Sequence, residues 1–110
     1  MDLKLVDQFL MDHKNEYINK PTGRTDDNGR PEVGVAQLFD VIGDLLSADL
    51  KDDEESFKQK TIRIELAKKF YLSENGEVTV TGEDIAEIER RASKLTSGIL
   101  CFAIDKAMSS

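Results

Sequence analysis

The sequence predicts a mainly α-helical fold, a small helical bundle of four to five helices with room for a minimal two-stranded β-ribbon. Apolar residues recur at spacings of three and four over most of the chain, which is the periodicity of an amphipathic helix. In addition, Thr81 is followed three positions later by Asp84, close to the capping box with which many helices begin. The length of 110 residues is typical of a single domain, here 1–110.

The N-terminal segment, residues 1–18, is expected to form a helix. Leu5 falls off its apolar stripe, which consists of Leu3, Val6, Phe9 and Leu10. A polar turn or linker, Asn19–Glu32, follows, and Val33–Met108 is expected to form the helical core. Within the linker, Asp27-Asn28-Gly29 is a strong turn signal because Asn and Gly tolerate positive φ. This turn either closes a small hairpin or belongs to a mobile loop.

Two helices are expected in the first half of the core. Val35–Ala48 has the clearest apolar stripe in the chain, formed by Val35, Leu38, Phe39, Ile42, Leu45 and Leu46. Gly43, inside this stripe, can allow another helix to approach closely. In the next helix, Glu54–Leu72, acids precede bases, an order that suits the helix dipole. Its apolar residues occupy two nearly opposite faces, so we expect neighbours on both sides and place it centrally.

A short extended segment is expected between the second and third core helices. Asn75-Gly76 ends the preceding helix, and Glu77–Thr81 is rich in Val and Thr, which favour strands. We expect this segment to pair with part of Asn19–Val33, which gives the two-stranded ribbon. Thr81 then caps the helix Glu83–Lys94.

The last helix, Gly98–Met108, is apolar around most of its circumference. It is therefore either the hub of the core or part of an oligomer interface. We expect Leu100, Phe102 and Ile104 to divide between the intrachain core and a contact surface. A homo-oligomer is compatible with this pattern.

Charge and composition disfavour several classes of function. The chain has 22 acidic and 15 basic residues and a net charge of −7, which disfavours direct nucleic-acid binding because phosphate contacts need surplus Lys and Arg. The single cysteine, Cys101, cannot form an intrachain disulfide and fits a reducing compartment. No apolar run approaches the roughly 18 residues of a membrane span, and the N-terminus lacks the features of a signal peptide.

Residues that carry enzyme chemistry are scarce. His13 is the only histidine and is expected on the surface, and Cys101 is expected to be a buried, inert thiol. The sequence has no Cys/His metal spacing, phosphate-binding loop or dinucleotide motif, and its acidic turns lack the spacing of a calcium loop. We therefore expect no metal, no cofactor and no enzymatic activity.

Charge is unevenly distributed around the start of the second core helix. The acidic corner, defined as Asp49, Asp52, Asp53, Glu54 and Glu55, precedes a basic stretch with Lys58, Lys60, Arg63, Lys68 and Lys69. The favoured interpretation of both is a solvated helix surface, and the alternative is that the acidic corner meets a basic partner protein. We expect neutralisation of Asp52, Asp53, Glu54 and Glu55 together to change fold stability little. The acidic corner and Phe102 are the candidate partner-binding residues.

Four stretches of the chain, taken in order, resemble a group of small proteins encoded by tailed bacteriophages and prophages. They are Asp27-Asn28-Gly29-Arg30-Pro31, Val33–Leu46, Lys60–Phe70 and Val80–Glu89. Those proteins similarly join a D-x-G-x-P turn, an apolar helix, a helix with K-x-x-x-x-x-L-A, and a capped helix with (V/L)-T-x-E-(D/E)-I. The resemblance covers Pro21–Met108 and implies a phage setting. The group has no established activity, so the resemblance assigns no functional residues.

These observations lead to two functional expectations. The first is a non-enzymatic protein-interaction module that binds and modulates a host or phage protein in the host cytoplasm. The second is a virion structural or assembly component that is repeated in a symmetric particle. Presence of the protein in purified particles separates the second from the first.

Overall fold

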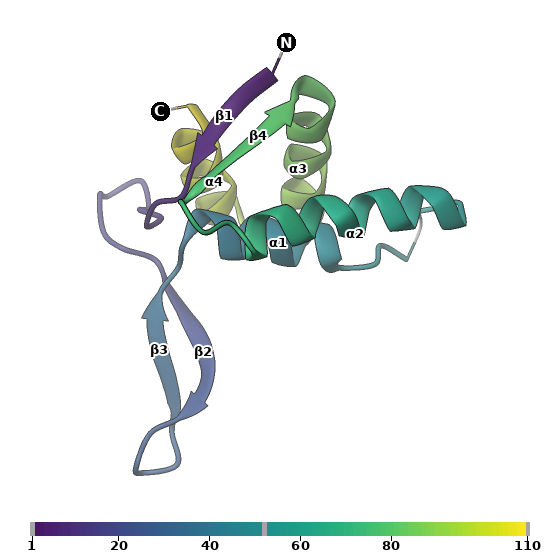
Figure 1. Ribbon diagram of the computed structural model, residues 1–110. Helices are drawn as coiled ribbons and strands as arrows, with labels where there is room; N and C mark the ends of the chain where they lie inside the picture. The colour runs from purple at the N-terminus through teal and green to yellow at the C-terminus, as the bar shows by residue number, and fades with distance from the viewer. Residues whose placement is uncertain (1, 52, 110) are drawn as a thin grey trace.

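The computed structural model describes residues 2–51 and 53–109. Over these residues the chain forms four helices and two two-stranded antiparallel sheets. The fold is therefore α+β, and the predicted mainly α-helical bundle is wrong. In chain order (Figure 1) the elements are β1 (Asp2–Val6), β2 (Asn19–Thr25), β3 (Pro31–Val35), α1 (Leu38–Ser47), α2 (Phe57–Tyr71), β4 (Glu77–Thr81), α3 (Gly82–Leu95) and α4 (Gly98–Ser109).

β1 stands where a helix is predicted for residues 1–18, so that prediction is wrong. The strand pairs with β4 in antiparallel register, with Leu3 opposite Val80 and Leu5 opposite Val78. Successive residues of a strand point to opposite faces, and accordingly Leu5 is 3% exposed whereas Val6 is 51% exposed. Leu3 and Leu5 have the two-residue period of a strand, and this period prevails over the helical spacing because it matches the two valines of β4.

After β1 the chain continues through a turn instead of a helix. The Asp12 carboxylate accepts hydrogen bonds from the main-chain N–H groups of Lys14 and Glu16. Asn15 adopts a φ of 60°, a left-handed conformation that Asn tolerates and that cannot continue a right-handed helix.

β2 and β3 form a hairpin, residues 19–35, that projects from the body of the molecule and that we call the arm (Figure 1). Closure of a hairpin at Asp27-Asn28-Gly29 is therefore confirmed. Gly29 has a φ of 75°, and the Asp26 carboxylate accepts hydrogen bonds from the N–H groups of Asn28 and Arg30. The expected ribbon between residues 77–81 and 19–33 is wrong, because the turn pairs the arm with itself and leaves β4 to β1.

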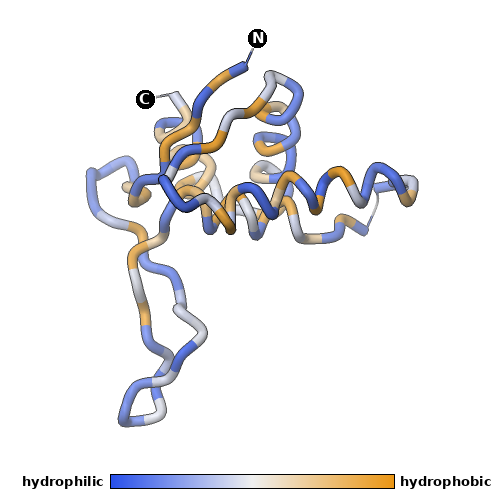
Figure 2. The backbone as a smooth tube through the Cα atoms, in the orientation of Figure 1, coloured by the Kyte–Doolittle hydropathy of each residue, from blue (hydrophilic) through white to orange (hydrophobic). Residues whose placement is uncertain are grey.

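The core lies where α1, α3 and α4 meet the inner face of the β1–β4 sheet, and apolar residues gather there in Figure 2. Its most deeply buried side chains, at 0–1% exposure, include Leu38, Ile42, Leu46, Ile88 and Ile104. The Thr81–Asp84 capping box is confirmed: the Thr81 hydroxyl accepts from the Asp84 N–H at 3.1 Å, and the Asp84 carboxylate accepts from the Thr81 N–H at 2.9 Å.

α2 packs mainly on α1 and is not the central helix that its two apolar faces predict. Its buried face comprises Arg63, Leu66, Ala67 and Phe70, and the Phe70 ring meets Phe39 of α1 edge-on with centroids 5.1 Å apart. The opposite face is open, with Phe57 88% exposed. The expected close approach at Gly43 is confirmed, because an added Cβ there would lie 2.6 Å from the Tyr71 ring.

None of the helices formed by the described residues combines the length and the apolar composition that a membrane span requires.

The alternation in β1 yields the first testable prediction. Leu5→Ala should lower the free energy of unfolding by about 2–5 kcal/mol, because it removes a side chain from the core. Val6→Ala should change it by about 0.5 kcal/mol or less, because that side chain is exposed. Urea unfolding followed by circular dichroism measures both. A helix over residues 1–18 predicts the reverse order, since Val6 would lie on its stripe and Leu5 off it.

Candidate functional site

The C-terminal end of α1 imposes the strictest hydrogen-bonding requirement in the body. The last four carbonyl groups of a helix have no partner within it, and here Leu45 and Leu46 are 5% and 0% exposed. The last turn of α1 contains no basic residue, and its cap residue, Ala48, has an extended main chain. The Ala48 N–H donates to the Asp44 carbonyl, whereas the donors for the Leu45 and Leu46 carbonyls come from other elements.

Arg63 of α2 supplies the first donors, with a side chain that is 4% exposed. Its Nη1 donates to the carbonyl oxygens of Leu46 and Ala48 at 2.7 and 3.0 Å. Its Nε donates to Glu55 Oε2 at 3.0 Å, and its Nη2 lies 3.0 Å from Glu55 Oε1 and 2.8 Å from Asp49 Oδ1. All three guanidinium nitrogens are therefore bonded.

Arg91 of α3 supplies the second donors, and its side chain is 0% exposed. Its Nη1 donates to the carbonyl oxygens of Leu45 and Ala48 at 3.2 and 2.6 Å. Its Nε donates to Glu87 Oε1, one helical turn earlier, at 2.8 Å. Two guanidinium groups from two different helices thus converge on the end of α1.

Asp53 completes this arrangement from the loop between α1 and α2. Arg90 donates to both Asp53 oxygens at 3.1 and 2.8 Å and to both Glu87 oxygens at 3.0 and 2.8 Å. Arg91 Nη2 has no hydrogen bond within the described residues and lies 3.7 Å from an oxygen of Asp53 and of Glu55. We call the whole set the arginine network: Arg63, Arg90, Arg91, Asp49, Asp53, Glu55 and Glu87.

The network stabilises its carboxylates in their charged form. Hydrogen bonds from Arg90 hold the pKa values of Asp53 and Glu87 below their ordinary range, and a hydrogen bond from Arg63 does the same for the pKa of Asp49. A group whose folded pKa is lowered stabilises the fold above its unfolded pKa. This stabilisation is present above the ordinary values of 3.8 and 4.5 and is lost as the pH falls through the lowered folded values.

The interpretation of the acidic corner as a solvated helix start is therefore wrong for Asp53 and Glu55, which are largely buried. The Asp53 and Glu55 side chains are only 14% and 16% exposed, and Asp49, although exposed, is bonded to Arg63. Glu54 is exposed, and Asp52 lies outside the described residues. Neutralisation of Asp53 or Glu55 consequently carries a stability cost, contrary to the expectation from sequence.

The position of Arg91 in the sequence contains a signal of its burial. Arg91 lies three residues after Ile88 and directly before Ala92, within the apolar stripe of α3. A long basic side chain on the buried face of a helix indicates a buried partner. For Arg63 the charge pattern suggests a solvated basic face, and the structure instead places it in the core with 5% exposure.

The last helix divides its apolar residues between the core and the surface. Ile104 is 1% exposed, whereas Phe102 is 46% and Ile99 50% exposed. Leu100 lies at the edge of the core, partly buried. The candidate contact residue Phe102 is therefore accessible to a partner. It is far from the acidic corner in the sequence.

The structure also places the side chains that commonly bind metal ions, and the single histidine and cysteine. Within residues 2–51 and 53–109, no three His, Cys, Asp or Glu side chains group in a way that fits a metal ion. His13 is exposed. Cys101 is half-buried, and its thiol donates to the Ala92 carbonyl at 3.3 Å.

The arm is joined to the body at its base by charge. Lys20 of β2 pairs with Asp44 of α1, and the Tyr71 hydroxyl donates to the other oxygen of Asp44. Beyond this base, every residue from 21 to 33 is exposed. Val33, which lies opposite Pro21, is 56% exposed.

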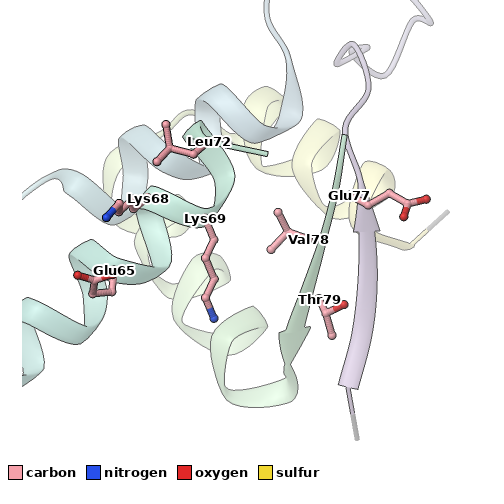
Figure 3. Close-up of a pocket in the computed structure, with 7 residues that line it drawn as sticks. All are labelled: Glu65, Lys68, Lys69, Leu72, Glu77, Val78 and Thr79. Atoms are coloured by element: carbon pink, nitrogen blue, oxygen red, sulfur yellow. The ribbon is translucent and has the colours of Figure 1, made fainter. Parts of the chain in front are cut away.

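A groove of about 540 Å³ separates α2 from β4 (Figure 3). The α2 side is formed mainly by Lys68 and Lys69, and β4 contributes Val78 and Thr79; Glu65, Leu72 and Glu77 complete the lining. In Figure 3, Lys69 extends from the helix into the space between helix and strand, and Val78 points into it from β4. The β1 strand lies on the other side of β4.

No protein-family model, curated protein or solved structure matches this chain.

The arginine network yields the second testable prediction. Glu55→Gln retains the shape of the side chain but removes the charge that faces Arg63 and Arg91. It should lower the free energy of unfolding by about 1.5–3 kcal/mol, the range for hydrogen bonds to charged groups. The matched control, Glu54→Gln, changes the exposed neighbour and should cost about 0.5 kcal/mol or less. Urea unfolding at neutral pH compares the two, and equal effects would show that Glu55 does not support the network.

Proposed function

We propose that this protein is a non-enzymatic protein-interaction module that binds and modulates a partner protein through the arm. The observation that supports this proposal is the exposure of residues 21–33. They belong to a hairpin whose register shifts between Pro21 and Thr25, and they are not covered by other parts of the described chain. The long dimension of the molecule, 44 Å against 29 Å in the other two directions, reflects this projection (Figure 1).

An isolated two-stranded hairpin is only marginally stable in water, and it gains stability from a third strand or from an apolar surface. The arm could be stabilised by a partner in both of these ways. Its outer strand edges carry main-chain groups suited to strand pairing, and one face carries Pro21, Val33 and Val35 in alternating positions. A partner protein that covers this face would supply the packing that the body does not.

The phage setting rests on the sequence resemblance and remains a prediction. An intracellular modulator would be found in the host cytoplasm. A virion component would be found in the phage particle. Mass spectrometry of purified particles distinguishes the two, because a structural component is present at defined stoichiometry.

The third testable prediction concerns the apolar face of the arm. Val33→Thr with Val35→Thr keeps the size and β-branching of both side chains but makes the face polar. The affinity for a partner isolated from the cells that produce this protein should fall at least about tenfold, as expected for two apolar anchors of an interface. Titration calorimetry with the purified partner measures the change, and circular dichroism should show an unchanged fold.

The control for this experiment changes two charged residues of the same arm that are not part of the apolar set Pro21, Val33 and Val35. Arg24→Gln with Glu32→Gln removes one positive and one negative charge, so the net charge is unchanged, and it should leave the affinity within about twofold of the wild type. Equal binding by the two double variants would contradict a role for the apolar face. Retained binding after replacement of residues 21–33 by an Asn-Gly turn would contradict a role for the arm.

A further inference from the structure

The free edge of β4 has main-chain groups without a strand partner. The Asp7 N–H donates to the Gly76 carbonyl at 2.8 Å, which continues the β1–β4 ladder by one pair. Bonded and non-bonded pairs alternate along an antiparallel ladder. Val78 and Val80 therefore direct their main-chain groups toward β1, and the residues between and beside them direct theirs toward the opposite edge.

Both ends of this opposite edge are already satisfied by side chains. The Ser73 hydroxyl accepts from the Glu77 N–H and donates to the Glu77 carbonyl, both at 3.1 Å. At the other end, Asp84 accepts from the Thr81 N–H at 2.9 Å. Thr79, between them, is the residue of this edge whose N–H and carbonyl groups have no such partner within the described residues.

Thr79 is part of the lining of the groove between α2 and β4, which is widely open to solvent. The N–H and the carbonyl group of Thr79 point to the same edge. One residue of an added antiparallel strand could bond to both of them. Recognition of an extended peptide by an open sheet edge is a common mode of protein binding. None of the residues that line the groove belongs to the arm.

Charge indicates which extended segment fits. Glu77 is already paired with Lys4 at 3.3 Å. Lys68 and Lys69 make no ion pair within the described residues, and Glu65 offsets only one of these two charges. Figure 3 shows the Lys69 side chain reaching into the groove, so an acidic side chain on an incoming segment would meet it.

We propose that the groove between α2 and β4 binds an extended segment of a partner protein that adds as a strand to β4. The segment forms two main-chain hydrogen bonds with Thr79, places an apolar side chain against Val78, and pairs an acidic side chain with Lys69. This surface is a second contact, separate from the arm. Engagement of both surfaces by one partner would raise the overall affinity through effective concentration.

The fourth testable prediction uses a synthetic probe, the capped peptide Thr-Val-Glu-Val-Glu-Val-Thr. Titration into isotopically labelled protein should shift the amide resonances of Thr79 and Val78 most, followed by those of Lys68 and Lys69. Methylation of the main-chain nitrogens of the central residues, which removes their N–H donors, should weaken binding roughly tenfold. Replacement of both glutamates by lysine should weaken it by a similar factor, because the charges then repel.

Protein variants test the same contact from the other side. Lys69→Glu should weaken binding of the glutamate peptide and strengthen binding of the lysine peptide, so specificity is reversed. Lys58→Glu makes the same charge change on the same helix outside the groove and should leave both affinities within about twofold. Shifts confined to the arm, equal binding of the methylated peptide, or no binding at millimolar concentration would each overturn the proposal and leave the proposed function of the arm unaffected.

Discussion

Leu45 and Leu46, at the C-terminal end of α1, are buried, and the arrangement of the body follows from how their main-chain carbonyls are satisfied. Their donors are Arg63 and Arg91, which belong to α2 and α3. Pairing therefore fixes two helices against the same end of a third. Buried cations in turn need negative partners, and the loop between α1 and α2 supplies three of them, Asp49, Asp53 and Glu55.

We infer that the network favours one arrangement of the helices, because a buried charge that loses its partner is costly. Removal of charged groups from water costs several kcal/mol per ion, and a buried pair often gains little over a well-packed apolar substitute. An apolar substitute, however, would leave the α1 carbonyls without donors. The guanidinium group suits this position because its donors lie in a fixed plane, and Arg63 uses every nitrogen at 2.7–3.0 Å.

The body thereby holds in place two strand surfaces that have no strand partner among residues 2–51 and 53–109. One is the arm, whose base is joined to α1 through Lys20 and Asp44. The other is the edge of β4, which is held opposite α2 by pairing with β1 and by the cap at Thr81. Strand edges recognise extended chains through main-chain groups, and their neighbouring side chains select among them. The proposals of protein binding rest on these two edges.

The helices could be predicted because each carries its signal locally. Val35–Ala48 shows an unbroken apolar period, and Thr81 with Asp84 marks the start of α3. The strand pairing could not be predicted, since Glu77–Thr81 could pair with several segments and the outcome depends on contacts between residues far apart in sequence. The same distance hides the arginine network, in which Arg91 bonds to Leu45. For the candidate site, the sequence shows the charges of the acidic corner. It does not show which arginines pair with them.

The most direct test of the central claim is the free energy of unfolding of Arg91→Met, measured by urea denaturation at neutral pH beside Arg90→Met. Methionine keeps much of the apolar stem of arginine but removes its donors. Loss of Arg91 should cost about 3–5 kcal/mol, because carbonyls and carboxylates that it pairs become unsatisfied in the interior. The Arg90 side chain is 38% exposed, so water can replace part of its pairing with Asp53 and Glu87, and its loss should cost less, about 1.5–3 kcal/mol. Equal stabilities of the two variants would contradict the dependence of the fold on the buried guanidinium groups.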